Sequence, residues 1–312
     1  DVERSRGLGD VYKRQPGNFT VLARWDGSSP KATEYGYLTY SPELPGNHIV
    51  DPMLWLAPNG NLWLFFGVMG NNEPFDGVQG AWAVICQNPN AEFPQWGRPF
   101  RLSYFADPRR PVQVNGEWYI ALDGWRHSAE FPPRYMEYVG GRIHRFDWQN
   151  QKLEFVSHLP PNNGTQYSGF FETEFCQRSD GSVLALCRSL SSAAETKYCV
   201  SEDLMQTWSA WQDYTTISPS SSSRMWLGRS PTGRMVFCWN NDLIRRTLTL
   251  GLSEDDGATY AHTVVLEPSS TGQVSYPIVT FGQADEILIA YDVERTGPCL
   301  LYTSDAADDS LR

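Results

Sequence analysis

The 312-residue sequence is short of charge and lacks long apolar runs. Charged residues make up only 20% of the chain, and its net charge of −11 argues against nucleic acid and anionic membrane surfaces as partners. No apolar run approaches the roughly 20 residues that a membrane-spanning helix needs. We therefore expect neither a nucleic-acid partner nor a membrane span.

Cysteine is also scarce, and its spacing matches no metal-binding motif. None of the six cysteines belongs to a C-x-x-C pair, and five remain when Cys299 near the C-terminus is set aside. Buried thiols without a bridge are the default for such a set. A Cys176–Cys187 bridge across adjacent strands is an alternative that nothing else in the sequence supports. Zinc constellations, phosphate loops and nucleotide fingerprints are absent too, so we predict no metal and no cofactor.

Sustained 3.6-residue periodicity is missing, which excludes long helices. The chain instead has 13% aromatic residues, including twelve Trp, and many short apolar runs between turn residues. Such runs, bounded by Gly, Asn, Asp and Pro, are typical of strands joined by hairpins. Strands are expected over residues 53–57, 62–68, 81–86, 118–122, 183–187, 235–239, 247–252 and 287–291. Hairpin turns are expected at residues 58–60, 115–116, 180–181 and 231–233.

Two segments share the pattern S-x-D-x-G-x-T-W, each with one departure. They read SEDLMQTW at 201–208, where Met205 replaces the Gly, and SEDDGATY at 253–260, where Tyr260 replaces the Trp. In such a turn the Asp binds nearby backbone N–H groups, the Gly takes a positive φ, and the aromatic residue packs between neighbouring sheets. The expected structural residues are Ser201, Asp203, Trp208, Ser253, Asp255, Gly257 and Tyr260.

This pattern resembles the Asp-box of sialidase-like β-propellers, the BNR-repeat superfamily of glycoside hydrolases that includes the sialidases (neuraminidases). Repetition at this period is typical of radial β-architectures. The resemblance implies an all-β, sialidase-like β-propeller, six-bladed in the family, with five to six blades present here. A short serine-rich stretch at residues 218–223 is predicted to be a surface loop rather than a linker, so we expect one domain.

The two ends of the chain lack any pattern that continues the neighbouring strands. Residues 1–15 and 299–312 resemble peptides translated from sequencing adaptors at the edges of metagenomic reading frames. We expect non-native tails there and a truncated propeller over residues 16–298. The missing signal-peptide pattern then says nothing about compartment, and the resemblance implies a secreted or periplasmic full-length parent.

Four residues occur in an order that resembles a sialidase active site, each at an expected strand edge. By this resemblance, Arg188 and Arg245 belong to an Arg triad that binds the substrate carboxylate, Tyr276 is the nucleophile, and Glu172 is its base. The chemistry agrees, because guanidinium forks bind carboxylates bidentately and a neutral phenol is not repelled by a carboxylate. Glu174, two residues along the strand, is an alternative base.

Two parts of the family's site have no clear counterpart upstream of residue 51. The first Arg of the triad is not identifiable, and Asp26 is only a weak match for the acid/base Asp. The resemblance therefore predicts an incomplete catalytic unit. In its complete form, it would be an exo-glycosidase acting on a terminal acidic sugar such as sialic acid.

A second cluster of aromatic residues follows Asp123. Trp125 and Tyr135 are candidates for a sugar-stacking platform, so we expect a carbohydrate partner. With a neighbouring Arg, His127 and Tyr135 leave open a uronate-cleaving polysaccharide lyase, in which Arg neutralises the carboxylate while Tyr or His moves protons. A non-catalytic carbohydrate-binding or scaffold propeller is a third alternative, since a fold does not specify a function.

Overall fold

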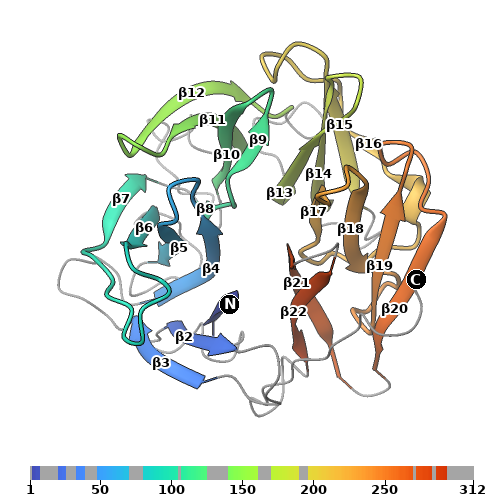
Figure 1. Ribbon diagram of the computed structural model, residues 1–312. Helices are drawn as coiled ribbons and strands as arrows, with labels where there is room; N and C mark the ends of the chain where they lie inside the picture. The colour runs from blue at the N-terminus through green and yellow to red at the C-terminus, as the bar shows by residue number, and fades with distance from the viewer. Residues whose placement is uncertain are drawn as a thin grey trace. The chain divides into compact units, whose positions relative to one another are not determined.

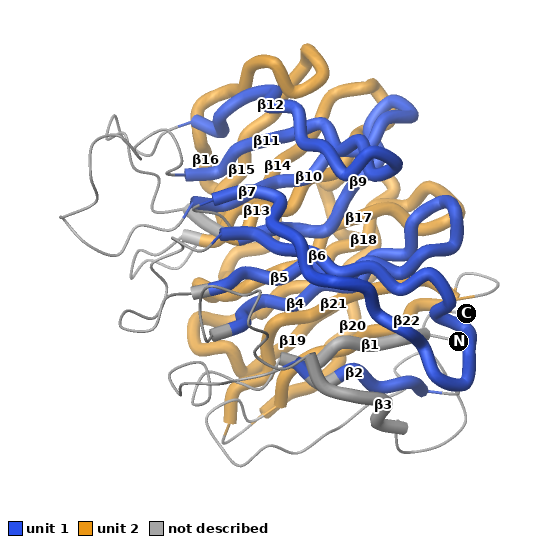
Figure 2. Tube along the Cα trace, turned by 90° about the vertical axis from the view of Figure 1, so that its left-hand side faces the viewer, with its two compact units in different colours: residues 1–168 blue, residues 169–312 orange. Residues whose placement is uncertain are grey.

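The computed structural model describes residues 2–7, 20–25, 33–38, 48–69, 80–104, 107–124, 140–160, 170–189, 196–269, 272–282 and 286–293. Within these ranges the chain consists of antiparallel strands and one short 3₁₀ helix, η2 (Thr215–Ile217), which confirms the all-β prediction. The chain divides into two compact units, residues 1–168 and 169–312, and each is described by itself (Figure 1; Figure 2).

Unit 1 contains three antiparallel sheets. Sheet A has the order β1-β2-β3, sheet B the order β4-β5-β6-β7, and sheet C the order β12-β11-β10-β8, with β9 also paired to β10. The strands are β1 (Val2–Gly7), β2 (Thr20–Trp25), β3 (Thr33–Leu38), β4 (His48–Leu56), β5 (Leu62–Met69), β6 (Ala81–Cys86), β7 (Phe100–Ser103), β8 (Asp107–Pro108), β9 (Val112–Val114), β10 (Glu117–Gly124), β11 (Gly140–Asp147) and β12 (Lys152–His158).

The main core of unit 1 lies between sheets B and C and is rich in aromatic rings. Trp55, Trp63 and Phe65 of sheet B pack against Ile120 and Phe146 of sheet C. The rings of Trp63 and Phe65 stack at 5.6 Å, and Phe146 meets Trp63 edge to face at 5.4 Å. Burial of one such ring stabilises the fold by roughly 1.5–3 kcal/mol. Much of the aromatic content noted in the sequence therefore serves packing.

Unit 2 also contains three antiparallel sheets. Sheet D has the order β13-β14-β15-β16, sheet E the order β17-β18-β19-β20, and sheet F pairs β21 with β22. The strands are β13 (Phe170–Gln177), β14 (Val183–Ser189), β15 (Lys197–Ser201), β16 (Gln212–Asp213), β17 (Trp226–Arg229), β18 (Met235–Asn240), β19 (Thr247–Ser253), β20 (His262–Pro268), β21 (Val274–Phe281) and β22 (Ile287–Val293).

Sheet E packs against a neighbouring sheet on each face. Successive residues of its strands point to opposite faces, so both sets of side chains are buried. Leu227 and Phe237 join a core cluster with Leu186 of sheet D. Their strand neighbours contribute to a second cluster, in which Trp226 packs with Ile289 of sheet F. The sheets of unit 2 are thus stacked in the order D, E, F, which brings their first strands β13, β17 and β21 next to one another.

The hairpin turns lie where the sequence predicts them, and each predicted strand overlaps an observed one. Asn115 and Gly116 join β9 to β10 with φ of 49° and 84°. Gly181, between β13 and β14, and Gly233, between β17 and β18, have φ of 89° and 88°. These left-handed conformations are accessible to Gly without steric cost, which is why local turn chemistry is readable from the sequence.

The cysteines that the structure describes are buried thiols without a disulfide, and they are Cys86, Cys176, Cys187, Cys199 and Cys238. This confirms the default expectation and rules out the Cys176–Cys187 bridge. The Cys187 sulfur instead lies 3.2 Å from the Thr173 hydroxyl. In the described part of the chain, no helix is long and apolar enough to cross a membrane.

Candidate functional site

The first strands of sheets D and F, β13 and β21, contain the same kind of β-bulge. Each bulge contains a residue with a polar side chain. In β13, pairing with β14 shifts between Phe171 and Glu174, and Glu172 has a φ of 57°. In β21 the register shifts in the same way around Tyr276, which has a φ of 60°. Bulges re-aim side chains beside active sites, and a left-handed conformation is strained for residues other than Gly. The backbone therefore marks Glu172 and Tyr276 as candidate functional residues.

Arg188 of β14 contacts both of these residues. Its Nη1 donates hydrogen bonds to Glu172 Oε2 at 2.7 Å and to the Tyr276 hydroxyl at 2.9 Å. The Glu172 side chain is 1% exposed and that of Arg188 13%. Burial opposes the charged form, but the charge of Glu172, the Tyr276 hydroxyl and their hydrogen bonds together raise the pKa of Arg188 above its ordinary value. Arg188 is therefore a permanent cation beside a phenol and a carboxylate.

Arg188 makes both contacts through one nitrogen. Among the described residues, its Nε and Nη2 have no hydrogen-bond partner. Because Nε and Nη2 form one edge of the planar guanidinium, this edge has the geometry that binds a carboxylate through two parallel hydrogen bonds.

Arg224, which the sequence analysis does not single out, completes the cluster. Its Nε lies 3.7 Å from Glu172 Oε1, and its guanidinium carbon lies 4.9 Å from the centre of the Tyr276 ring. The residue is 4% exposed. One feature of the sequence could have revealed it: like Glu172 and Tyr276, Arg224 stands at the start of the first strand of its sheet, here just before β17.

Arg245 reaches the same ring from the β18–β19 connection. Its guanidinium carbon lies 5.6 Å from the centre of the Tyr276 ring, and its backbone has a φ of 61°. Its Nε donates to the Ser222 carbonyl at 3.1 Å, and its backbone N–H donates to the Ser221 hydroxyl at 3.0 Å. Val274 N–H donates to the Arg245 carbonyl at 2.8 Å. Arg245 is thus held firmly, while its Nη1 has no partner among the described residues.

The serine-rich segment at residues 218–223 is a surface loop only at its start, where Ser218 and Pro219 are exposed. Ser220, Ser221 and Ser223 are only 2%, 5% and 2% exposed. Ser220 Oγ accepts a hydrogen bond from Thr196 N–H at 2.9 Å, and Ser221 Oγ donates to the Asp242 carbonyl at 2.5 Å. The prediction is wrong for the rest of the segment, because small hydroxyls can satisfy buried backbone groups and a polar run need not face solvent. The segment instead supports Arg245.

The structure describes only one of the other predicted site residues, Glu174. Trp125, Tyr135, His127 and the weak acid candidate Asp26 lie outside the described residues. Glu174 is buried, but the ion pairs with Arg188 and Arg224 are made by Glu172.

Unit 1 has a polar cluster of its own around Asp123. Arg109 Nε lies 3.6 Å from Asp123 Oδ2, and Arg109 also pairs with Asp107. All three side chains are at most 1% exposed. The charge of Arg109 is offset within the protein by the two carboxylates, so we assign the cluster a structural role.

The two Ser-Asp turns are built alike. Ser201 Oγ accepts from Met205 N–H at 2.8 Å, and Ser253 Oγ accepts from Gly257 N–H at 2.8 Å. In the first turn Asp203 Oδ1 accepts from Thr207 N–H at 2.9 Å, and in the second Asp255 Oδ1 accepts from Thr259 N–H at 2.8 Å. Met205, which replaces the glycine, adopts a φ of 66°, against 86° for Gly257.

These turns lie away from the cluster. Ser201 pairs with Val183, whereas Arg188 pairs with Phe171, so the first turn is at the opposite end of sheet D from Arg188. The ring of Tyr260, which ends the second turn, packs 5.7 Å from that of Phe237. The geometry of both turns is therefore consistent with a structural role.

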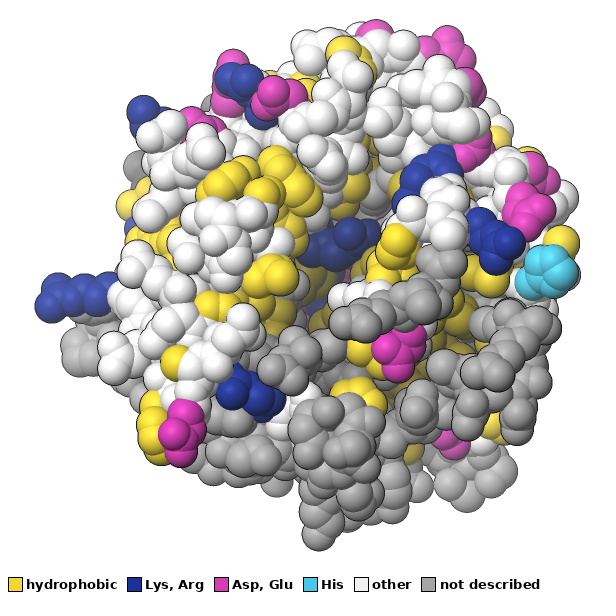
Figure 3. Space-filling view, viewed as in Figure 1, with side chains coloured by type: hydrophobic (Ala, Val, Ile, Leu, Met, Phe, Trp, Pro, Cys, Tyr) yellow, Lys and Arg dark blue, Asp and Glu magenta, His cyan; other side chains and the backbone are white. Residues whose placement is uncertain are grey.

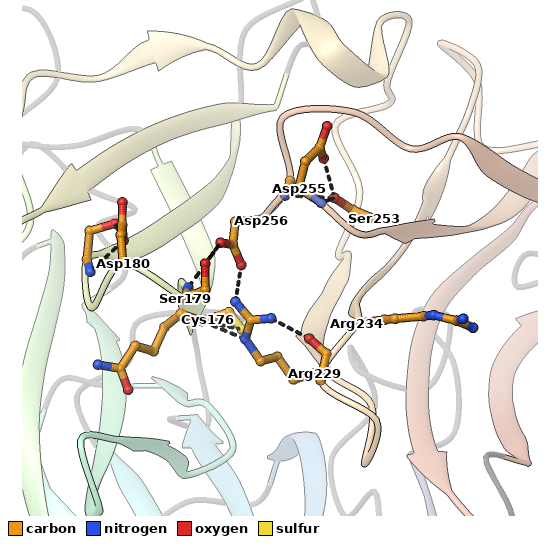
Figure 4. Close-up of polar contacts among 12 residues, drawn as sticks. Cys176, Ser179, Asp180, Arg229, Arg234, Ser253, Asp255 and Asp256 are labelled. Carbon is orange, nitrogen blue, oxygen red and sulfur yellow. Dashed lines mark hydrogen bonds and ion pairs between the residues drawn. The ribbon is translucent and has the colours of Figure 1, made fainter.

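The second turn is also tied to the neighbouring sheet through Asp256, as Figure 4 shows. Asp256 accepts hydrogen bonds from the backbone N–H of Ser179 at 3.0 Å and from the Ser179 hydroxyl, and it pairs with Arg229. Arg229 Nε in turn donates to the Gln177 carbonyl at 2.8 Å. These contacts join the β13–β14 hairpin of sheet D to sheet E.

Charge on the described surface is mixed. On the face seen in Figure 3, basic and acidic side chains are interspersed. Within the described ranges, no group of His, Cys, Asp and Glu side chains could hold a metal ion. The arginines around Tyr276 have the chemistry to bind an anionic ligand.

Solved structures with the same fold include sialidases. A protein of unknown function from Dyadobacter fermentans is 13% identical with a TM-score of 0.65, over 89% of this chain and 80% of that one. A Hadza microbial sialidase is 13% identical with a TM-score of 0.65, over 92% of this chain and 58% of its own length. The intramolecular trans-sialidase from Ruminococcus gnavus, in complex with oseltamivir carboxylate, is 10% identical with a TM-score of 0.63. The match covers 93% of this chain and 86% of that one.

These similarities show that the fold is that of a sialidase-like β-propeller, as the sequence predicts. The sequence itself matches the BNR repeat-like domain over residues 37–287, and the chain belongs to this family. No curated protein sequence matches it.

Proposed function

We propose that this chain carries the nucleophile, the base and two arginines of a sialidase-like exo-glycosidase, which hydrolyses the bond to a terminal acidic sugar. The observation that carries the proposal is the contact of Arg188 Nη1 with both Glu172 and Tyr276. It joins a cation, a phenol and a buried carboxylate, the groups that a Tyr nucleophile needs when the substrate is an anion. The sialidases among the structural neighbours support the same substrate class.

The arginines account for binding. Nη2 of Arg188 and Nη1 of Arg245 are the donors that would hold the carboxylate of the sugar, because Nε of Arg188 is itself buried. This contact would fix the ring and its anomeric carbon. The Ruminococcus gnavus enzyme was solved with a carboxylate ligand, which supports this assignment. The two Ser-Asp turns are then Asp-boxes with a purely structural role.

We propose the following reaction for these residues. Tyr276 Oη attacks the anomeric carbon while its proton passes to Glu172, and the bond to the leaving oxygen breaks with its electron pair remaining on that oxygen. A general acid protonates this oxygen, and Asp26 is the sequence's candidate for it. Water then attacks the anomeric carbon and gives its proton to the conjugate base of that general acid, while the bond to Tyr276 breaks and Glu172 returns its proton to the phenolate.

The test is hydrolysis of 4-nitrophenyl α-sialoside by the 312-residue chain. A nitrophenolate leaves without protonation, so the assay does not depend on the general acid. We expect release of nitrophenol with the α-anomer of the sugar as first product, and none from the neutral 4-nitrophenyl β-galactoside. Failure to hydrolyse the sialoside, together with failure to bind a 2,3-unsaturated sialic acid, would contradict the proposal. Cleavage of a uronate polymer with a rise in ultraviolet absorbance would establish the lyase alternative instead.

A further inference from the structure

Arg224 differs from the other two arginines of the cluster in its surroundings. Its side chain is 5% exposed, against 13% for Arg188, and it lies against the Tyr276 ring beside the almost fully buried Glu172. A buried cation is costly unless it has a nearby counter-charge, and Glu172 supplies one at 3.7 Å. Arg224 is therefore a buried part of the site that contacts other protein side chains.

Arg224 touches the two groups that the proposed reaction must keep together. Its guanidinium carbon is 4.9 Å from the centre of the Tyr276 ring, within the range of a cation–π interaction. Its Nε faces Glu172 Oε1, whereas Arg188 binds the other oxygen, Oε2. Glu172 is thus held between two cations, and the phenol is held by its ring as well as by its hydroxyl.

The backbone makes such support necessary. Tyr276 has a φ of 60° in a bulge, and a strained conformation persists only where the surroundings over-determine it. A ring fixed by its hydroxyl alone could still pivot about that contact. A misplacement of about 1 Å can reduce the rate of a reaction roughly 100-fold.

We propose that Arg224 is a positioning residue, which holds the Tyr276 ring against the Glu172–Arg188 pair and does not bind the substrate. The kinetic part of this inference rests on the proposed function, whereas its geometric part does not. Arg224 lies two residues before β17, whose neighbours β13 and β21 carry Glu172 and Tyr276. The packing of these three strands thus brings the members of the unit together.

The kinetic test compares Arg224→Met, Arg224→Lys and a matched control, Arg229→Met, on 4-nitrophenyl α-sialoside. Met keeps the volume but removes the charge, and we expect kcat to fall about 100-fold with KM changed less than about threefold. Lys keeps the charge without the planar group, so it should restore part of kcat. Arg229 ends β17, the strand that follows Arg224, and pairs with Asp256, so its variant should lose stability but keep kcat.

The geometric test is a crystal structure of Arg224→Met, or of Arg224→Lys if the first variant does not fold. We expect the Tyr276 hydroxyl to move out of hydrogen-bonding range of Arg188 Nη1. An unmoved Tyr276 with unchanged kcat would overturn the inference, as would a rise in KM at constant kcat, which would make Arg224 a substrate ligand. If the parent chain hydrolyses no sialoside but Tyr276 still moves, the proposed function fails while the positioning role stands.

Discussion

Arg188 and Tyr276 are 88 residues apart in the sequence, and Nη1 of Arg188 donates a hydrogen bond of 2.9 Å to the Tyr276 hydroxyl. The same nitrogen binds Glu172, so a single guanidinium group connects the proposed base and the proposed nucleophile. Arg188 lies in sheet D and Tyr276 in sheet F, the two outer sheets of the stack that forms unit 2. The integrity of sheet E, which lies between them in this stack, is thus a condition for the site.

Tyr276→Phe removes the proposed nucleophile but keeps the ring that packs with Arg224. We expect the rate on an aryl sialoside to fall by several orders of magnitude, whereas binding of a 2,3-unsaturated sialic acid should weaken only slightly. Tyr198→Phe is a matched control, because the Tyr198 hydroxyl donates an exposed hydrogen bond to Gln212 in the edge strand of sheet D. Equal rates for the two variants would exclude Tyr276 as nucleophile.

Asp255→Asn tests the second Ser-Asp turn through its dependence on pH. The Thr259 hydroxyl, and then the Thr259 N–H, lower the pKa of Asp255 from 3.8 to about 2. Since the folded state prefers the charged form, this stabilisation is present above about pH 4 and is lost as pH falls through about 2. The Tm of the variant should therefore lie below that of the parent at neutral pH, and the gap should narrow between pH 4 and pH 2. A gap that is constant over this range would contradict the assignment.

Gly257→Ala should destabilise the chain more than Gly233→Ala does. Both glycines have a positive φ, near 86° and 88°, so both substitutions incur a backbone cost of about 1 kcal/mol. A Cβ at residue 257 would also lie 2.8 Å from the Tyr214 hydroxyl and 3.0 Å from the Met235 sulfur, whereas one at residue 233 meets nothing within 4 Å. We expect an extra loss of about 1–3 kcal/mol for Gly257→Ala in denaturant unfolding. Equal losses would show that the core around Tyr214 yields to the added methyl group.

Asp256 and Arg229 should prove energetically coupled. A double-mutant cycle with Asp256→Ala and Arg229→Met is expected to give a coupling free energy of about 0.5–1 kcal/mol. This value is at the low end of the range for contacting residues, because the pair is partly exposed. Asp180→Ala is a control for general effects of charge, since Asp180 binds Ser182 within its own turn. Strict additivity of the two single variants would show that the contact does not join sheets D and E energetically.

Local chemistry was readable from the sequence, and long-range neighbours were not. The Asn115-Gly116 turn follows from backbone preferences of those two residues, and the Glu172, Arg188 and Tyr276 set follows from their order along a family pattern. Arg224 escaped notice because its role arises only when β13, β17 and β21 become neighbours. Its flanking serines, moreover, were interpreted as a surface loop. Pro277, directly after Tyr276, was the overlooked local sign of a bulge, since proline cannot donate to a ladder.

Unit 1 contains a bulge of the same kind near the start of β4, the first strand of sheet B. Here Asp51 has a φ of 50° and precedes Pro52. One chain thus places a short carboxylate, a long carboxylate and a phenol on the same local backbone, at Asp51, Glu172 and Tyr276. Because a bulged residue takes no part in the regular pairing, its side chain can change while the hairpin keeps its register. Evolution could therefore alter the chemistry at such positions one codon at a time while the packed cores remain as they are, and a designer could do the same.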